Sequence, residues 1–348
     1  MELGTLPELD ELERILADVS HDAVQVEVLH REHYRGRTYP VHVVTLARDD
    51  GEPRPTLMLM AGVHGLERIG TQVLVAYLRT LTARLRWDAQ LDHLLRRAKI
   101  VLLPLFNPIG VLLHRRANAR GVDLMRNAPI TSPSEAHPLS LYRGQSLSAR
   151  LPYYRGKGIE PEVAALTRYF QERLFTSAPI VSLDLHSGFG HRDQLWFPYA
   201  HSRQRFPQTA EVLALSHLLE ESHPHHRYVV EPQARHYTVH GDLWDYLYQV
   251  HQRTPQGGAF LPLTLEMASW GWIRKNPRQF TSRLGLFHPI KAHRVKRVLR
   301  RHLSLLDFLT HATASPAAFC QLDEARRSLL LLEASKRWPE LHPGPPST

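Results

Sequence analysis

The chain has 348 residues, of which 43% are hydrophobic and 22% charged, enough for one large α/β domain or two small ones. No stretch approaches the roughly 18 uninterrupted apolar residues of a membrane span, and with its acidic N-terminus we expect neither a secretory signal nor a transit peptide. The only cysteine, Cys320, excludes an internal disulfide and a cysteine-rich metal site. We therefore expect a cytoplasmic protein in which any metal is held by histidine and carboxylate side chains.

The formal net charge of +9 comes from scattered basic residues and one dense cluster at 291–302. In this cluster Val295, Val298 and Leu299 fall at helical spacing, which leaves the lysines and arginines on the opposite helix face. We interpret the cluster as a solvated helix face rather than a nucleic-acid patch, so no nucleic-acid partner is expected. A positive field would still favour acidic substrates.

Apolar periodicity predicts strands that alternate with helices. In chain order we expect a helix at 7–19, strands near 24–28 and 41–43, a strand at 56–61, a helix at 66–85, a strand at 100–105 ending in a turn at 107–110, a Ser/Pro-rich loop at 129–158, a helix at 160–175, strands at 180–185 and 195–199, helices at 207–220 and 240–250, a strand at 259–265 and a helix at 289–313. This order predicts an α/β fold whose mixed, mostly parallel twisted sheet carries helices on both faces. We assign residues 1–314 to one catalytic domain and 315–348 to a C-terminal helix with a Pro-rich tail.

Four chemically active side chains lie at the predicted carboxyl ends of core strands. His64 and Glu67 follow the strand at 56–61, His186 follows 180–185, and Glu266 follows 259–265. Strand ends of an open α/β sheet meet at one edge, so these side chains are expected to lie together. Two histidines and a glutamate are the protein ligands of a catalytic zinc site that keeps one position open for water. Glu266 is then a candidate general base, although each residue alone is also typical of packing or a salt bridge.

With these residues the sequence resembles the zinc carboxypeptidases of the carboxypeptidase A superfamily, and most of all a short bacterial branch. The resemblance runs from about residue 55 to 310. It implies one zinc per chain, bound by His64, Glu67 and His186, and Glu266 as the general base.

The same resemblance implies a set of substrate-binding residues. In the segment 121–127, Asp123 corresponds to the residue that orients the first zinc histidine, and Arg126 to the arginine that binds the terminal carboxylate of the substrate. Asn127 stands beside it as a further substrate-binding candidate. At Arg115-Arg116, we favour Arg116 as the arginine that polarises the scissile carbonyl and keep Arg115 as a substrate-binding candidate.

Three more positions in this set concern the substrate pocket. Tyr237 corresponds to the mobile tyrosine that closes over the substrate. The family's asparagine before the carboxylate-binding arginine is Met125 here, so an amide donor is lost. Recognition of the substrate carboxylate is then weaker, shared with another residue or replaced, although Arg126 can still make a bidentate contact. That Met125 only packs in the core is an equally open alternative. Trp244 corresponds to the pocket floor and would shrink or fill the side-chain pocket, unless its helix is rotated relative to the family.

Three functions compete at this stage. The leading interpretation is a zinc-dependent hydrolase that cleaves an amide or peptide bond next to a free carboxylate, in a peptide or an acyl amino acid. The alternative is an N-acyl amino acid amidohydrolase, like the aspartoacylase and succinylglutamate desuccinylase relatives of the same fold. A non-catalytic binding protein is the third. Tyr237 and the second arginine favour the peptidase, and the oligomeric state stays open.

Overall fold

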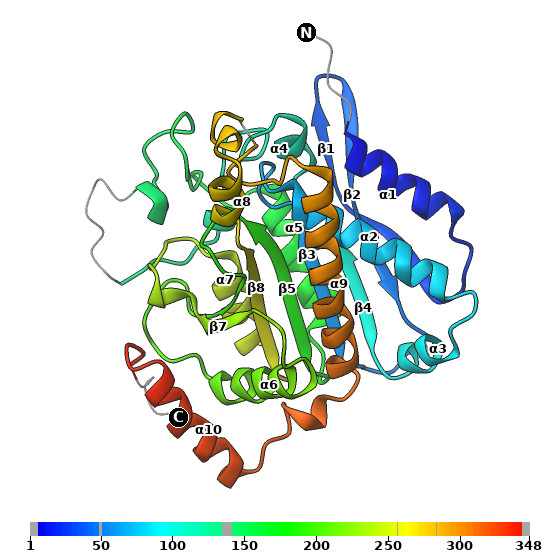
Figure 1. Ribbon diagram of the computed structural model, residues 1–348, viewed down its shortest axis with the longest axis vertical. Helices are drawn as coiled ribbons and strands as arrows, with labels where there is room; N and C mark the ends of the chain where they lie inside the picture. The colour runs from blue at the N-terminus through cyan, green and yellow to red at the C-terminus, as the bar shows by residue number, and fades with distance from the viewer. Residues whose placement is uncertain (1–5, 49–50, 134–140, 256, 283, 343–348) are drawn as a thin grey trace.

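The computed structural model describes residues 6–48, 51–133, 141–255, 257–282 and 284–342. Its strands form one eight-stranded sheet (Figure 1). In sequence order they are β1 (Val24–Tyr34), β2 (Arg37–Leu46), β3 (Thr56–Ala61), β4 (Lys99–Leu103), β5 (Ile180–Ser187), β6 (Gln194–Phe197), β7 (Val229–Pro232) and β8 (Phe260–Met267).

The strand order across the sheet is β1-β2-β4-β3-β5-β8-β6-β7. The pairs β3–β4, β3–β5, β5–β8 and β6–β7 are parallel, whereas β1–β2, β2–β4 and β6–β8 are antiparallel. The predicted mixed, mostly parallel sheet is therefore confirmed. Every residue of β3 and β5 is buried, as expected for central strands that lie between two layers of helices.

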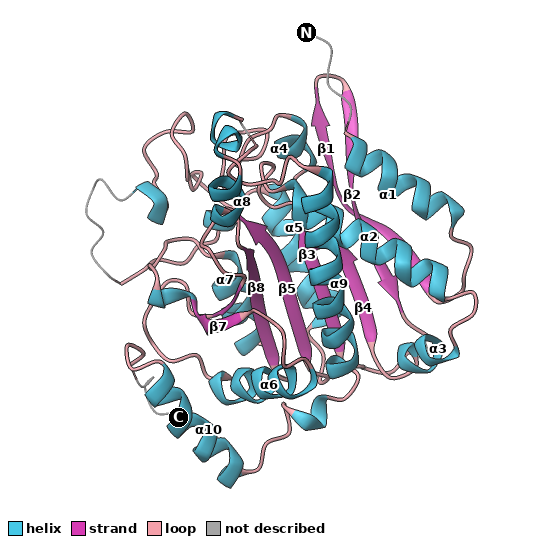
Figure 2. Ribbon diagram, in the orientation of Figure 1, coloured by secondary structure: helices cyan, strands magenta, loops and turns pink. Residues whose placement is uncertain are grey.

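Helices cover both faces of this sheet (Figures 1 and 2). They are α1 (Pro7–Asp18), α2 (Arg68–Arg84), α3 (Ala89–Leu95), α4 (Pro108–Leu112), α5 (Pro161–Tyr169), α6 (Thr209–Ser222), α7 (Leu243–Gln252), α8 (Trp270–Lys275), α9 (Ala292–Thr313) and α10 (Glu324–Arg337). In the view of Figure 1, α2, α6 and α9 lie in front of the sheet, and α5 and α7 lie behind it. None of the described helices is long and apolar enough to cross a membrane.

The basic helix expected near the C-terminal end is α9. Its buried side chains include Val298 and Leu306, whereas Lys296, Arg297 and Arg300 are exposed, so the charges lie on the solvent face. After it, α10 packs against α6, and Trp338 at its end is buried in the main core. The predicted Pro-rich tail lies largely outside the described residues.

Some boundaries differ from the prediction. The expected turn at 107–110 is the start of α4: the Asn107 side chain accepts a hydrogen bond from the Gly110 N–H, and Pro108 occupies the first helical position. Strands β5 and β8 extend to Ser187 and Met267, since the two strands remain paired in parallel up to these residues. His186 and Glu266 therefore lie inside the ends of strands rather than after them. The short elements α3, β7 and α8 were not predicted.

Candidate metal centre and active site

Neighbouring strand ends bring the predicted ligands together. His64 lies in the loop after β3, Glu67 is the residue before the first turn of α2, and His186 and Glu266 are register partners on β5 and β8. The His64 loop packs tightly on α4: a Cβ atom at Gly65 would lie only 1.9 Å from the carbonyl carbon of Gly110. Only glycine at position 65 allows this close approach.

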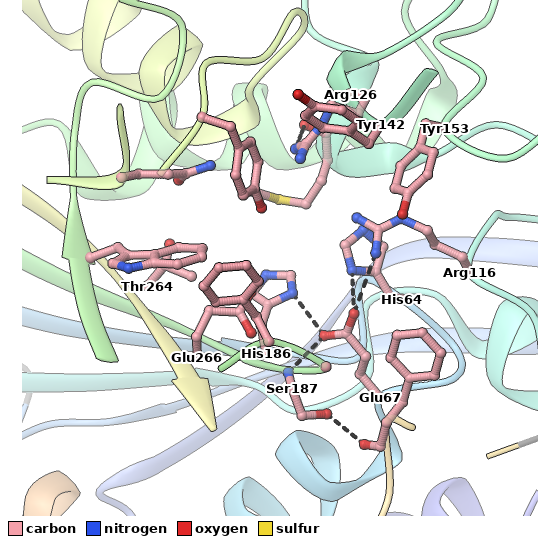
Figure 3. Close-up of a pocket in the computed structure, with 17 residues that line it drawn as sticks. His64, Glu67, Arg116, Arg126, Tyr142, Tyr153, His186, Ser187, Thr264 and Glu266 are labelled. Carbon is pink, nitrogen blue, oxygen red and sulfur yellow. Dashed lines mark hydrogen bonds and ion pairs between the residues drawn. The ribbon is translucent and has the colours of Figure 1, made fainter. Parts of the chain in front are cut away.

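Three side chains converge on one point. His64, Glu67 and His186 each offer a ligand atom, and these atoms all lie within 4.8 Å of one another. The Nδ1 atom of His64 is 2.9 Å from Glu67 Oε1, and the Nδ1 atom of His186 is 3.0 Å from Glu67 Oε2. All three residues are buried, and Figure 3 shows His64 and His186 on either side of the Glu67 carboxylate. Both imidazoles thus turn the same ring nitrogen toward a shared carboxylate.

The opposite ring nitrogens are held by carboxylates. His64 Nε2 lies 3.0 Å from Asp123 Oδ1, and His186 Nε2 lies 2.8 Å from Asp184 Oδ2. Trp244 supports this second pair because its Nε1 donates to the same Asp184 oxygen at 2.9 Å. Such partners fix the orientation of a metal-binding imidazole.

The placement of Trp244 corrects one expectation. The side chain was expected to fill the substrate pocket, but it lies in the core, 3% exposed, and does not line the cavity. Its indole N–H points to Asp184 instead, because α7 carries it behind the metal ligands.

Charge pairing sets the protonation of these groups. Burial opposes ionisation of Glu67, but the imidazoles of His64 and His186 outweigh it and hold the pKa of this carboxyl well below its ordinary value. Burial is likewise outweighed at Asp123, where Arg116 and His64 lower the pKa. At His186 the carboxylates of Asp184 and Glu67 overcome burial and raise the imidazole pKa. A metal that needs a neutral imidazole would therefore displace a proton on binding.

The ligands line a cavity of about 300 Å³ (Figure 3). Glu266 lines it too, and its Oε2 atom is buried without a hydrogen-bond partner among the described residues. Burial, followed by repulsion from Glu67, raises the pKa of Glu266 to about 8. This carboxyl can therefore accept and release a proton near neutral pH.

Two arginines line the same cavity, but their guanidinium groups differ in their contacts. Arg116 Nε donates to Asp123 Oδ2 at 2.6 Å, its Nη1 is 3.5 Å from Glu67, and its guanidinium lies over the Tyr153 ring. Arg126 is only 4% exposed, and its Nε has no hydrogen-bond partner in the described part of the chain. The nearest carboxylate to Arg126 is Asp242, at 3.9 Å from Nη1.

Two substrate-binding candidates lie elsewhere. Arg115 donates to the Ala119 carbonyl oxygen at 2.9 Å and does not line the cavity. Asn127 also lies outside the cavity wall, since its amide donates to the carbonyl oxygens of Arg155 and Gly158 at 2.8 Å each. Both side chains bind nearby backbone carbonyl oxygens, and neither lines the cavity.

The other predicted pocket residues are present in the cavity wall. Tyr237 lines it, and burial raises the pKa of its hydroxyl to about 12, so the hydroxyl stays protonated at neutral pH and can donate a hydrogen bond. Met125 lines it as well and also belongs to the hydrophobic core. Gly241 has φ +73°, and a Cβ atom there would lie 1.8 Å from the Arg126 carbonyl oxygen, so the loop carrying Tyr237 packs directly on Arg126.

Comparison with known proteins identifies the family. A family model described as zinc carboxypeptidase matches residues 24–274. The chain belongs to the zinc carboxypeptidase family. Members of this family are hydrolytic enzymes of the metallocarboxypeptidase type, and zinc is the metal of the family.

The similarity to individual relatives is low in identity or limited to part of the chain. The chain is 23% identical over 276 residues to Carboxypeptidase SOL1 of Arabidopsis thaliana, which covers 76% of this chain and 50% of that protein. It is 35% identical over 115 residues to Murein peptide amidase A of Escherichia coli, covering 32% and 43% respectively. The matches thus span half or less of these relatives. The structure of bovine thrombin-activatable fibrinolysis inhibitor in complex with tick carboxypeptidase inhibitor shares the fold, with a TM-score of 0.66, 17% identity, and coverage of 90% of this chain and 98% of that one.

Several residues that line the cavity or hold its ligands were missed by sequence reasoning. Thr264 lies two residues before Glu266 on β8, so strand alternation could have found it on the same face. Asp184 stands in the same relation to His186 on β5. Tyr142 and Tyr153 line the cavity from the loop region 129–158, where no periodic pattern pointed to them.

Proposed function

We propose that the chain hydrolyses an amide or peptide bond next to a free carboxylate. The observation that carries this proposal is a single cavity with a His-Glu-His ligand set, an unpaired buried carboxyl oxygen on Glu266 and a guanidinium nitrogen of Arg126 without a partner among the described residues. A metal site, a proton acceptor and a carboxylate anchor are what hydrolysis of such a bond requires. The single cysteine, Cys320, favours a cytoplasmic compartment.

The ligand set fits zinc. Two imidazoles and one carboxylate are the donors of a three-ligand catalytic zinc site, and thiolate is not needed. Because the Nε2 atoms of His64 and His186 already face carboxylates, their Nδ1 atoms are the ones left for a metal. We propose one zinc ion in this cavity, held by these two atoms and Glu67. A bound zinc ion supplies Lewis acidity, which polarises a carbonyl group and makes water more acidic.

Glu266 is the proposed proton carrier. Its carboxylate takes a proton from the attacking water and returns it to the leaving amine. The unpaired Oε2 atom makes this possible, because no other donor among the described residues occupies it. As a register neighbour of His186 rather than a ligand, Glu266 lies beside the metal site.

The arginines and Tyr237 are proposed to act on the substrate. A guanidinium grips a carboxylate through two parallel hydrogen bonds, and Arg126 has donors to offer for this contact. Arg116, fixed by Asp123 and Glu67, adds positive charge where the carbonyl oxygen becomes negative. Tyr237 closes the cavity wall next to Arg126.

A panel of substrates tests the proposal. The zinc-loaded protein is incubated with N-blocked dipeptides that carry a free C-terminus, with the same dipeptides amidated, and with N-acyl amino acids. We expect cleavage of the free acids, loss of cleavage after zinc removal, and recovery when zinc is restored. No hydrolysis of any panel member by the zinc-loaded protein would point to the non-catalytic binding protein instead.

A second candidate substrate has one specific observation in its favour. The 35% identity over 115 residues to Murein peptide amidase A suggests an amide bond within a murein peptide. Such peptides also carry free carboxylates, so the same anchoring groups apply. Cleavage of murein peptides in preference to simple dipeptides would favour this candidate, and cleavage of N-acyl amino acids alone would favour the amidohydrolase.

A further inference from the structure

A second group of metal-ligand side chains lies outside the cavity, between β1 and the first turn of α5. His30 and Glu32 are two residues apart on β1, so they lie on the same face of the strand. Glu162 comes from α5, which packs against β1. One ligand atom from each of the three lies within 4.8 Å of the other two. Among the described residues, this group and the catalytic one are the two with such an arrangement.

The carboxylates of this group are removed from solvent. The side chains of Glu32 and Glu162 are 5% and 1% exposed, and that of His30 is 25% exposed. Glu32 Oε1 lies 3.0 Å from His30 Nε2, yet it makes no hydrogen bond of acceptable geometry within the described chain. A buried carboxylate oxygen without a partner is unfavourable, because it has lost its hydrogen bonds to water. The approach of an imidazole nitrogen to a glutamate oxygen repeats the arrangement of His64 and Glu67.

Charge in this cluster is unbalanced. Glu32, Glu160 and Glu162 supply three carboxylates, and in the described part of the chain Arg120 is the arginine or lysine that forms ion pairs with the last two. The buried carboxyl groups of Glu32 and Glu162 also repel each other. A further positive charge between the two buried carboxylates would remove this repulsion.

We propose that His30, Glu32 and Glu162 bind a second divalent cation, with zinc as the metal that suits them best. A mixed set of imidazole and carboxylate favours zinc over calcium or magnesium, which take oxygen ligands. The oxygens of Glu162 accept hydrogen bonds from Asn118 at 2.8 Å and Arg120 at 2.6 Å. Each oxygen has a second lone pair for a metal, so these donors orient the carboxylate without blocking it.

A cation bound at this site would connect three segments of the chain. It joins β1, the start of α5 and the turn containing Asn118 and Arg120. That turn leads directly into Asp123, which holds His64. The role assigned to the second cation is therefore structural, and it does not depend on the hydrolase activity.

Counting metal in a catalytic-site variant tests the proposal. The metal-free protein is loaded with zinc, excess zinc is removed by gel filtration, and zinc per chain is measured by elemental analysis. We expect His186→Ala to keep one zinc, and His186→Ala combined with Glu32→Gln to keep none. Zinc should raise the thermal unfolding midpoint of the first variant but not of the second. The count in wild type and in Glu32→Gln alone, expected to be two and one, does not require His186→Ala to fold.

A matched control is available on the surface. Glu13 Oε1 lies 3.4 Å from His42 Nε2, but the glutamate side chain is 49% exposed and no third ligand from the described residues joins this pair. Adding Glu13→Gln to His186→Ala should leave one zinc bound. The proposal is overturned if folded His186→Ala keeps no zinc and its unfolding midpoint does not respond to zinc. A proton shared by Glu32 and Glu162 would then balance the charge.

Discussion

Replacing Trp244 by Phe tests whether the hydrogen bonds behind His186 support the metal centre. Trp244 Nε1 donates to Asp184 Oδ2 at 2.9 Å, and the same oxygen lies 2.8 Å from His186 Nε2. Phenylalanine keeps a ring in this buried position but has no N–H. Since Asp184 Oδ1 has no hydrogen-bond partner among the described residues, the carboxylate would keep only its bond to His186.

The size of the effect follows from burial. Asp184 is fully buried and Trp244 is 3% exposed, so water does not replace the lost donor. A hydrogen bond to a charged group is worth about 1.5–3 kcal/mol, and the free energy of unfolding of the metal-free protein should fall by about that much. Loss of a partner behind a metal-binding histidine typically weakens metal affinity by about 10–100-fold, and we expect a zinc dissociation constant raised within that range.

Two measurements separate this role from simple packing. Urea unfolding of the metal-free protein gives the stability change, and competition with a chromophoric chelator gives the zinc affinity. Trp338→Phe is the matched control: it removes the same part of a ring at a site 1% exposed, at the end of α10. It should lower stability without changing zinc affinity. Equal zinc affinity in the two variants would show that the indole N–H does not position His186.

Three further predictions concern the cavity and the pH dependence of stability. Glu266→Gln should bind zinc as wild type does but lose about 10²–10⁴-fold in kcat, because a general acid–base step is worth that much; turnover within tenfold of wild type would contradict the assigned role. Arg126→Lys should raise KM for substrates with a free carboxylate and leave amidated ones unaffected, whereas Arg116→Ala should mainly lower kcat; equal cleavage of acid and amide by wild type would show that no carboxylate is recognised. Burial lowers the pKa of His302 to about 4. Between pH 6.5 and 4 the unfolded chain therefore binds a proton that the folded chain does not, so stability falls as the pH falls through this window and does not change above it. Between pH 7.5 and 5, urea unfolding should show wild type losing about 2 kcal/mol more than His302→Gln, and parallel curves would refute this.

The convergence of His64, Glu67 and His186 could be predicted because the signals of these residues are local. Each stands at the end of a short apolar run, and parallel strands bring such ends to one edge of the sheet. His64 and Glu67 needed only their three-residue spacing and the strand before them. The family resemblance then supplied roles for Glu266 and Arg126 that no spacing encodes, and these roles remain proposals.

Other features depend on contacts that the sequence does not encode locally. Tyr153 reaches Arg116 from a loop with no periodic pattern, so only the folded chain shows the pair. The pair Asn107-Pro108 is typical of a turn and equally of a helix start. In the structure a helix starts here, and Gly110 of that helix packs against Gly65. Trp244 has a large apolar side chain on a helix, which gives no hint that its N–H faces Asp184.

The two cavity arginines carry the same charge but offer it differently to a substrate. Arg116 is already paired with Asp123 at 2.6 Å and Glu67 at 3.5 Å, so much of its charge neutralises the carboxylates around the metal ligands. Arg126 has no carboxylate within hydrogen-bonding distance in the described structure, and its neighbour Met125 has a thioether that accepts only weakly. The Met125 side chain therefore does not compete for the Arg126 donors, although the Met125 carbonyl oxygen accepts from Nη1 at 3.4 Å. We expect the loss of the family's asparagine to remove one donor to the substrate while leaving the guanidinium free to bind the carboxylate through two hydrogen bonds.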